Sequence, residues 1–349
     1  MSQSPDHAPP LREDTFAAPP AGPDWPFHLG LAVLGGVYVV LIVAMIAADA
    51  FYTTPGHLFD ALQSKEIRYA IYLSLISCSV TTILSLWVAV PLGYLLSRHQ
   101  FPFRGLINAL LDIPIVLPPL VVGLSLLILF QTPAGKAVER LTRERTGVIL
   151  ATGILPLLGV LTVEVVRRVF VPGRWAAVPA LLAAGAVNAA WVLLTPSGRA
   201  YAGWLQERFA TDITYAVPSV ILAQFAVAAA FAVQTMRVTF DGISPRCEQV
   251  ALTLGCTRSQ AFWWVLLPEA RRGLVTAATL AWARALGEFG PVLVFSGATR
   301  LRTEVLPTTV FLELSVGNLH GAVAVSLLMV AAAMAVLVIV RVFGTGRQA

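Results

Sequence analysis

Residues 241–272 read DGISPRCEQVALTLGCTRSQAFWWVLLPEARR, a polar stretch set between long apolar runs, and this contrast indicates the class of fold. Of all residues in the chain, 57% are hydrophobic and only 12% are charged, and the mean hydropathy is +0.77. Such a composition is typical of a membrane protein that crosses the bilayer several times. A charged loop between two membrane spans is in turn a candidate contact surface for a partner.

Apolar runs long enough to cross the membrane recur along the chain. A helix needs about 20 apolar residues to span the hydrocarbon core. Runs of that length predict spans at 27–50, 69–95, 106–130, 149–170, 175–194, 217–236, 273–296 and 319–343. Because backbone groups cannot stay unpaired in lipid, and barrel strands are shorter, the expected fold class is all-α, a polytopic transmembrane helical bundle. The runs 149–170 and 175–194 contain polar residues, so a re-entrant or interfacial hairpin is the alternative for them.

The distribution of basic residues predicts the orientation. When loops are assigned alternately to two sides, Lys and Arg are more frequent on the side that holds both chain ends and residues 241–272, which places these parts in the cytoplasm. Residues 1–26 are rich in Pro, Ala and acidic groups and lack the features of a cleavable signal, which predicts a disordered cytoplasmic tail. The transmembrane domain is then 27–343, and 344–349 form a cytoplasmic C-terminus.

Several function classes lack the residues they need. The arginines are scattered through short loops and form no basic stripe, so nucleic acid is not an expected partner. Cys78, Cys247 and Cys256 have no metal-ligand spacing, and no metal site is predicted. No catalytic constellation and no phosphate-binding G-x-x-x-x-G-K-[ST] sequence occurs, so the chain is expected to be neither an enzyme nor a holder of a cofactor.

The polar stretch predicts two short helices. Pro245 can begin a helix, Glu248 favours the positive N-terminal end of that helix, and Gly255 supplies a stop about two turns later. A second short helix is expected over residues 259–267, broken by Pro268 before the next span. The two helices together form a compact docking knob.

These positions resemble the EAA loop of ABC importer permeases. The positions that correspond to this loop are occupied by Glu248, Gln249, Ala251, Gly255, Phe262, Leu267 and Pro268. The chain departs from the family pattern at Gln249 and Val250. In that family the loop enters a cleft on a separate ATPase subunit, so the resemblance implies that ATP and Mg are bound by a partner and that the coupling is mechanical.

A second resemblance concerns the permease subfamily. Residues 283–290 (ARALGEFG), followed by residues 295–297 (FSG) and Leu306-Pro307, are similar to molybdate and sulfate permeases. The resemblance implies a six-helix permease core with an inserted segment at 131–215. It also implies a bacterial inner-membrane location, a homodimer, and an extracytoplasmic solute-binding protein. The implied cargo is a tetrahedral oxyanion, with molybdate or tungstate ahead of sulfate or thiosulfate.

Charged residues inside a predicted span are candidates for the translocation pathway or gate. Arg284 and Glu288 lie four residues apart on one helical face, and charges in a span usually face a cavity or one another. Ser296 adds a hydroxyl to this candidate pathway, and the alternative is an ion pair that only fixes helix packing. A rival function of another class is a non-transporting membrane enzyme or scaffold that works through residues 131–215.

Overall fold

The computed structural model describes residues 25–149, 151–152, 188–209 and 212–344, and this part contains helices and no strands. The first helix, α1, begins at Trp25. Residues 1–24 of the expected tail lie outside the described residues. The predicted runs 149–170 and 175–194 and the C-terminal residues 345–349 lie largely outside them as well. The helices are α1 (Trp25–Tyr52), α2 (Pro55–Gln63), α3 (Lys65–Arg98), α4 (Arg104–Val116), α5 (Pro119–Gln131), α6 (Pro133–Ile149), α9 (Pro196–Phe209), α10 (Val217–Asp241), α11 (Pro245–Thr253), α12 (Arg258–Ala261), η2 (Phe262–Leu266), α13 (Leu267–Glu269), α14 (Arg271–Leu286), α15 (Gly290–Ser296), α16 (Leu306–Val316) and α17 (Leu319–Gly344).

Helix length and composition confirm the all-α membrane fold. Within the described residues, α1, α3, α10 and α17 are each long and apolar enough to cross a membrane, and the pair α4 and α5 adds a fifth span if it counts as one. Residues 1–52 form a unit separate from residues 53–349. Most side chains of α1 are exposed, as expected of a helix whose apolar residues face lipid.

Two of the predicted spans, 106–130 and 273–296, are each divided into two helices. The chain bends by 112° between α4 and α5. Pro118 and Pro119 follow Leu117 there, and proline both disfavours helical backbone in the residue before it and donates no N–H to the helix. The second span divides into α14 and α15 at residues 287–289, where Pro291 lies in the first turn of α15.

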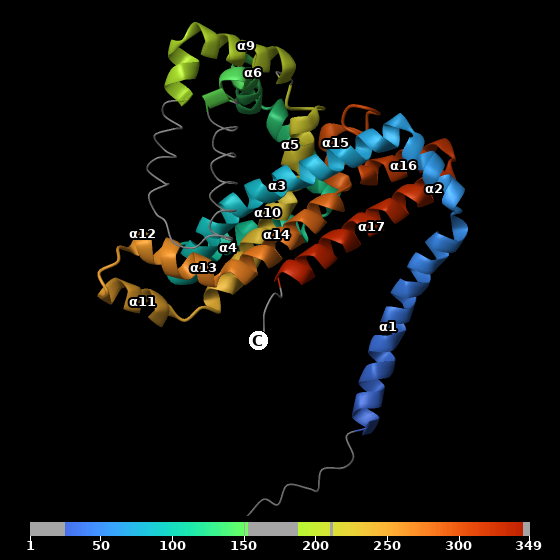
Figure 1. The fold of residues 1–349 in the computed structure, drawn as a ribbon, viewed down its shortest axis with the longest axis horizontal. Coiled ribbons are helices and arrows are strands. Elements are labelled where there is room, and N and C mark those ends of the chain that lie inside the picture. The colour runs from blue at the N-terminus through green and yellow to red at the C-terminus, as the bar shows by residue number, and fades with distance from the viewer. Residues whose placement is uncertain (1–24, 150, 153–187, 210–211, 345–349) are drawn as a thin grey trace, which may run out of the picture. The chain divides into compact units, whose positions relative to one another are not determined.

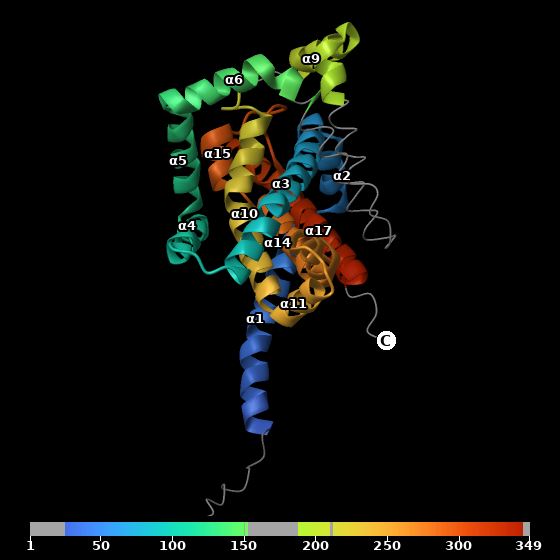
Figure 2. The ribbon, with the colours of Figure 1, turned by 90° about the vertical axis from the view of Figure 1, so that its left-hand side faces the viewer.

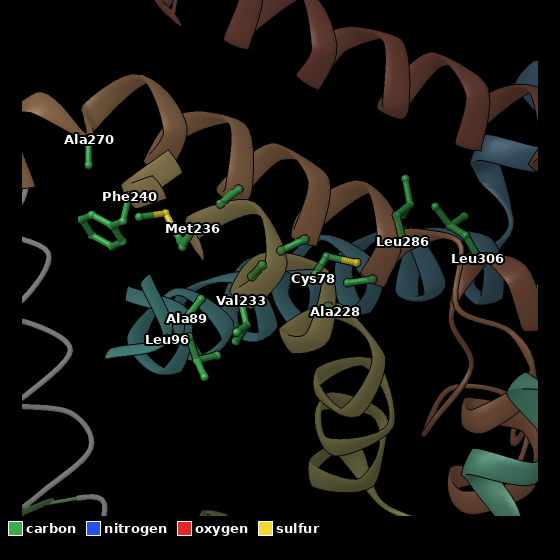
Figure 3. Packing of buried hydrophobic residues seen from close by; sticks show 14 of the residues in the cluster. Cys78, Ala89, Leu96, Ala228, Val233, Met236, Phe240, Ala270, Leu286 and Leu306 are labelled. Carbon is green, nitrogen blue, oxygen red and sulfur yellow. The ribbon is translucent and has the colours of Figure 1, made fainter. Parts of the chain in front are cut away.

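Small residues let the central helices approach closely. α3 packs along α10, and α14 packs against both. Ala89 on α3, Ala228 and Ala232 on α10 and Ala277 on α14 are all fully buried. Figure 3 shows Cys78, Ala89 and Ala228 in this shared interior, beside Val233 and Met236. In lipid, helices associate largely through such close packing, which small side chains permit.

The bundle of residues 53–349 has two distinct ends. α11, α12 and α13 lie at one end, and α2, α15, α16 and α6 lie at the other (Figures 1 and 2). α9 packs against α6. The Thr214 amide donates to Glu139 of α6 at 3.0 Å, which ties the inserted segment to the start of α10.

The loop 297–305 is a rigid connection at the end that holds α16. Arg300 Nη2 and Asn318 Nδ2 donate to the two carboxylate oxygens of Glu313 at 2.9 and 2.7 Å. These bonds join the loop, α16 and the start of α17. Next to them, Glu304 is fully buried, and within the described residues no donor reaches its carboxylate oxygens with good hydrogen-bond geometry. Burial raises the pKa of Glu304 above its usual 4.5, and the nearby Thr309 hydroxyl and Arg300 guanidinium offset only part of this effect.

We expect Glu304→Gln to stabilise the protein at neutral and alkaline pH. A carboxyl group whose pKa is raised on folding makes its full contribution to the free energy of unfolding below its unfolded pKa. This contribution is lost as pH rises through the folded pKa. The neutral amide removes this dependence, so the gain in melting temperature is largest above neutral pH and shrinks toward pH 4.5. Melting curves of the purified protein and the variant across this pH range test it. A gain that is equal at every pH would contradict it, and Glu269→Gln, an exposed glutamate, is the control.

Candidate functional site

The ends of α11 lie where the sequence predicts them. Pro245 occupies the first turn, and the Ser244 side chain accepts a backbone hydrogen bond at the cap. At the other end Gly255 has φ +89°, a left-handed conformation that glycine adopts without a Cβ penalty, and the following amide of Cys256 reaches the Ala251 carbonyl at 3.1 Å. A Cβ on Gly255 would meet nothing within 4 Å, so its backbone angle, rather than space, requires glycine.

α11 has apolar residues on two faces, one packed against the bundle and one exposed. Ala251 is buried, where its small side chain lets α11 lie close to the neighbouring helices. Gln249 is exposed, and so are Val250 and Leu254, which are 57% and 79% accessible. Residues four apart share a helix face, so Val250 and Leu254 form an apolar pair at the end of the bundle. Apolar side chains on a polar loop fit contact with another protein.

Glu248 does not point outward as a free charge. The Tyr94 hydroxyl donates to Glu248 Oε1 at 2.9 Å, and Arg98 Nε lies 3.9 Å from Oε2. Arg98 also donates through Nη2 to the Ile243 carbonyl at 2.6 Å. The side chains of Arg98 and Glu248 are only 11% and 16% exposed. Glu248 therefore fastens α11 to the end of α3.

Phe262 completes this cluster from the second short helix. Its ring lies 4.8 Å from that of Tyr94 and 6.2 Å from that of Phe240, measured between centroids. Tyr94 and Phe240 are themselves in contact at 5.8 Å. The three rings join α3, α10 and η2 in edge-to-face and tilted arrangements that aromatic pairs prefer.

The second helix is longer than predicted. α12, η2 and α13 continue one another from Arg258 to Glu269, so Pro268 does not break the helix where it was expected to. η2 is a π-helical turn in which the Leu267 amide reaches the Phe262 carbonyl. This wider turn comes directly before proline, the residue that has no N–H to donate, and so accommodates it. Leu267 is partly buried and Pro268 is exposed.

The candidate pathway residues are only partly brought together. Arg284 Nη1 lies 3.3 Å from Glu288 Oε2 at the break between α14 and α15, where Glu288 is 1% exposed. The Arg284 guanidinium also lies over the Phe231 ring at 5.3 Å. Ser296 is fully buried at the far end of α15, and its hydroxyl has no partner in the described part of the chain. The ion pair at the break is compatible with a pathway role and with a packing role.

Sequence reasoning missed Tyr94, Arg98 and Phe240. Tyr94 and Glu248 are 154 positions apart, and no spacing rule connects them. From the sequence, Arg98 after a predicted span contributes only to the charge bias that indicates orientation. Among the described residues, no group of three or more His, Cys, Asp or Glu side chains could hold a metal ion. The arrangement is suited to transmitting motion between a partner and the bundle.

Comparison with known proteins shows similarity to membrane components of transport systems. A family model described as a binding-protein-dependent transport system inner membrane component matches residues 89–345. The probable molybdenum ABC transporter permease protein of Haloferax volcanii is 28% identical, over 90% of this chain and 89% of its own length. The sulfate transport system permease protein CysT of Escherichia coli is 24% identical over 90% of both chains. The molybdenum transport system permease protein ModB of Mycobacterium tuberculosis is 27% identical over 89% and 90% of the two chains.

A solved structure shares the fold. A bacterial ABC transporter involved in the import of the acidic polysaccharide alginate matches with a TM-score of 0.58 and 14% identity, over 93% of this chain and 97% of that one. The same kind of transporter matches in complex with an alginate pentasaccharide-bound periplasmic protein, with a TM-score of 0.58 and coverage of 90% and 92%.

Proposed function

Because the chain belongs to the family of binding-protein-dependent transport system inner membrane components, we propose that it is the permease subunit of an ATP-driven importer for a tetrahedral oxyanion. Molybdate or tungstate is the first candidate cargo, supported by the similarity to molybdenum permeases and by the motif at residues 283–290. Sulfate is the second, supported by the similarity to CysT. The chain itself contributes the membrane passage and no catalytic residue.

The observation that carries the proposal is the structure of the loop 241–272. A short helix with two exposed apolar residues, Val250 and Leu254, is fastened by Glu248 to the end of a membrane bundle. If the loop were not held to the bundle, a displacement by a partner would change only the loop. Because Glu248 holds it to α3, the displacement is transmitted to the membrane helices. This is the arrangement needed to convert closure of an ATPase into a rearrangement of membrane helices.

The mechanism follows from this attachment. A separate ATPase subunit binds ATP and Mg and contacts the exposed face of α11. Its closure displaces the loop 241–272, and the helices fastened to that loop move between inward-facing and outward-facing arrangements. Arg284 and Glu288 lie at the break between α14 and α15, where a change of helix angle alters access to the interior, and we place them at the gate with Ser296.

The proposed assembly contains two copies of this permease, two ATPase subunits and an extracytoplasmic solute-binding protein in a bacterial inner membrane, with both chain ends in the cytoplasm. The match to a transporter solved with its periplasmic protein supports the binding-protein partner. Under this orientation α2, α16 and the loop 297–305 face the binding protein, since they lie at the end of the bundle opposite α11 (Figure 1).

The test is ATP hydrolysis and anion uptake by permease, ATPase and binding protein reconstituted in liposomes. Molybdate, tungstate and sulfate are added separately, and liposomes without binding protein are the control. We expect molybdate or tungstate to stimulate both hydrolysis and uptake. Stimulation by sulfate alone would support the second cargo. No response to any of these anions would overturn the proposal and favour a non-transporting membrane enzyme or scaffold.

A further inference from the structure

One helix is fastened to the loop 241–272 at one end of the bundle. Tyr94 of α3 donates its hydroxyl hydrogen bond to Glu248, and its ring touches Phe262 and Phe240. Arg98, one turn further along, bonds the Ile243 carbonyl in the segment that joins α10 to α11. α3 therefore contacts both short helices of the loop, and a displacement of the loop acts directly on this helix.

The same helix is fastened to the loop 297–305 at the opposite end. The Tyr69 hydroxyl donates to the Arg302 carbonyl at 3.0 Å. The Ser74 hydroxyl accepts from the Leu306 amide at 2.8 Å, and Ser74 is almost fully buried. α3 has 34 residues. At 1.5 Å per residue it reaches roughly 50 Å, enough to connect the two ends of the bundle.

α3 is also a continuous route between these ends, in contrast to α14. α14 continues directly from the loop 241–272, but it ends at Leu286, and the next helix begins only at Gly290. A displacement along α14 is therefore not transmitted rigidly across residues 287–289. α3 has no such break. Pro91 removes one backbone donor within it, but Gly93, two residues on, lies so close to α10 that a Cβ would come within 2.8 Å of Met236 Cβ. This contact holds the stretch around the proline in place.

We propose that Tyr94 is a positioning residue that transfers the displacement of the loop 241–272 into α3, and that α3 carries it to the loop 297–305 through Tyr69. The inference rests on the proposed transport function. In this proposal, the two hydrogen bonds are the two ends of a single mechanical connection. Tyr94 bonds Glu248 at one end, and Tyr69 bonds Arg302 at the other. Docking of the ATPase, by contrast, depends on the exposed face of α11.

The test uses Tyr94→Phe and Tyr69→Phe in the full reconstituted transporter. Each change removes one hydroxyl and keeps the ring, so packing and folding are retained. For each variant the amount of ATPase that co-purifies and the anion taken up per ATP hydrolysed are measured. We expect co-purification to be unchanged and uptake per ATP to fall roughly tenfold for Tyr94→Phe, as one hydrogen bond to a charged group is lost. Tyr69→Phe is expected to lower uptake per ATP in the same direction.

Tyr72→Phe is the matched control, since Tyr72 lies on α3 between the two and is 64% exposed. It is expected to behave as the unchanged protein. The double variant Tyr69→Phe/Tyr94→Phe is expected to be no worse than the more impaired single variant, because both bonds belong to one connection. Normal uptake per ATP in Tyr94→Phe, or loss of ATPase binding in it, would overturn the inference while leaving the transport function standing. Failure of the unchanged transporter to respond to any anion would overturn both.

Discussion

Glu248→Lys is expected to abolish ATP-driven uptake while leaving the protein inserted in the membrane. The new ammonium would lie beside Arg98 in a region where both side chains are largely buried, and the Tyr94 hydroxyl would lose its acceptor. Breaking a buried ion pair in this way costs about 3 kcal/mol or more. Unlike Tyr94→Phe, this change also makes Arg98 repel α11, which displaces the helix together with its exposed face, so ATPase co-purification and anion-stimulated hydrolysis should both fall at least roughly tenfold, since 1.4 kcal/mol is a factor of ten.

The control is Glu269→Lys, which makes the same charge change in the same loop at an exposed position. It should retain ATPase co-purification and stimulated hydrolysis. If the two variants behave alike, the effect is one of net charge in the loop and the attachment through Glu248 is not the cause. Normal uptake in Glu248→Lys would refute the role of the attachment.

Gly93→Leu should prevent the bundle from forming. A Cβ at this position would lie 2.8 Å from Met236 Cβ and 2.9 Å from the Arg237 amide nitrogen of α10. The second of these is backbone, which cannot rotate away, so α3 and α10 would have to separate along their most extensive contact. Overpacking in a core costs about 3 kcal/mol when side chains can adjust, and the cost rises when backbone must move. The yield of membrane-inserted, monodisperse protein and its melting temperature measure the effect.

Gly105→Leu is the corresponding control. Gly105 lies in α4, and a Cβ there would meet nothing within 4 Å. Because leucine also has a higher helix propensity than glycine, this variant should be as stable as the unchanged protein or slightly more stable. Equal loss of yield in both variants would show that leucine on any helix, and not the contact between α3 and α10, is responsible.

Much of the architecture could be predicted from local patterns. Apolar length located α1, α3, α10 and α17, and the positions of Pro245 and Gly255 located α11. These features depend on residues close in sequence: solvation by lipid, missing N–H donors and left-handed backbone. The same reasoning failed at Pro268, because the π-helical turn before it changes the hydrogen-bond register in a way that residue types alone do not reveal. Apolar length does not reveal the breaks at residues 117–118 and 287–289, because a span that bends contains as many apolar residues as a straight one.

Local sequence patterns are enough to predict an all-helical membrane protein with a polar docking loop that resembles those of importer permeases, since hydropathy and local backbone chemistry act over one or two helical turns. The role of Glu248 becomes visible only in the folded chain. Sequence reasoning treated it as a favourable charge at a helix N-terminus, whereas the fold pairs it with Tyr94 and Arg98 from a helix more than a hundred residues away. Such pairing depends on how α3 and α10 pack, and that packing is set by small residues whose contacts are specified only once the whole bundle has assembled.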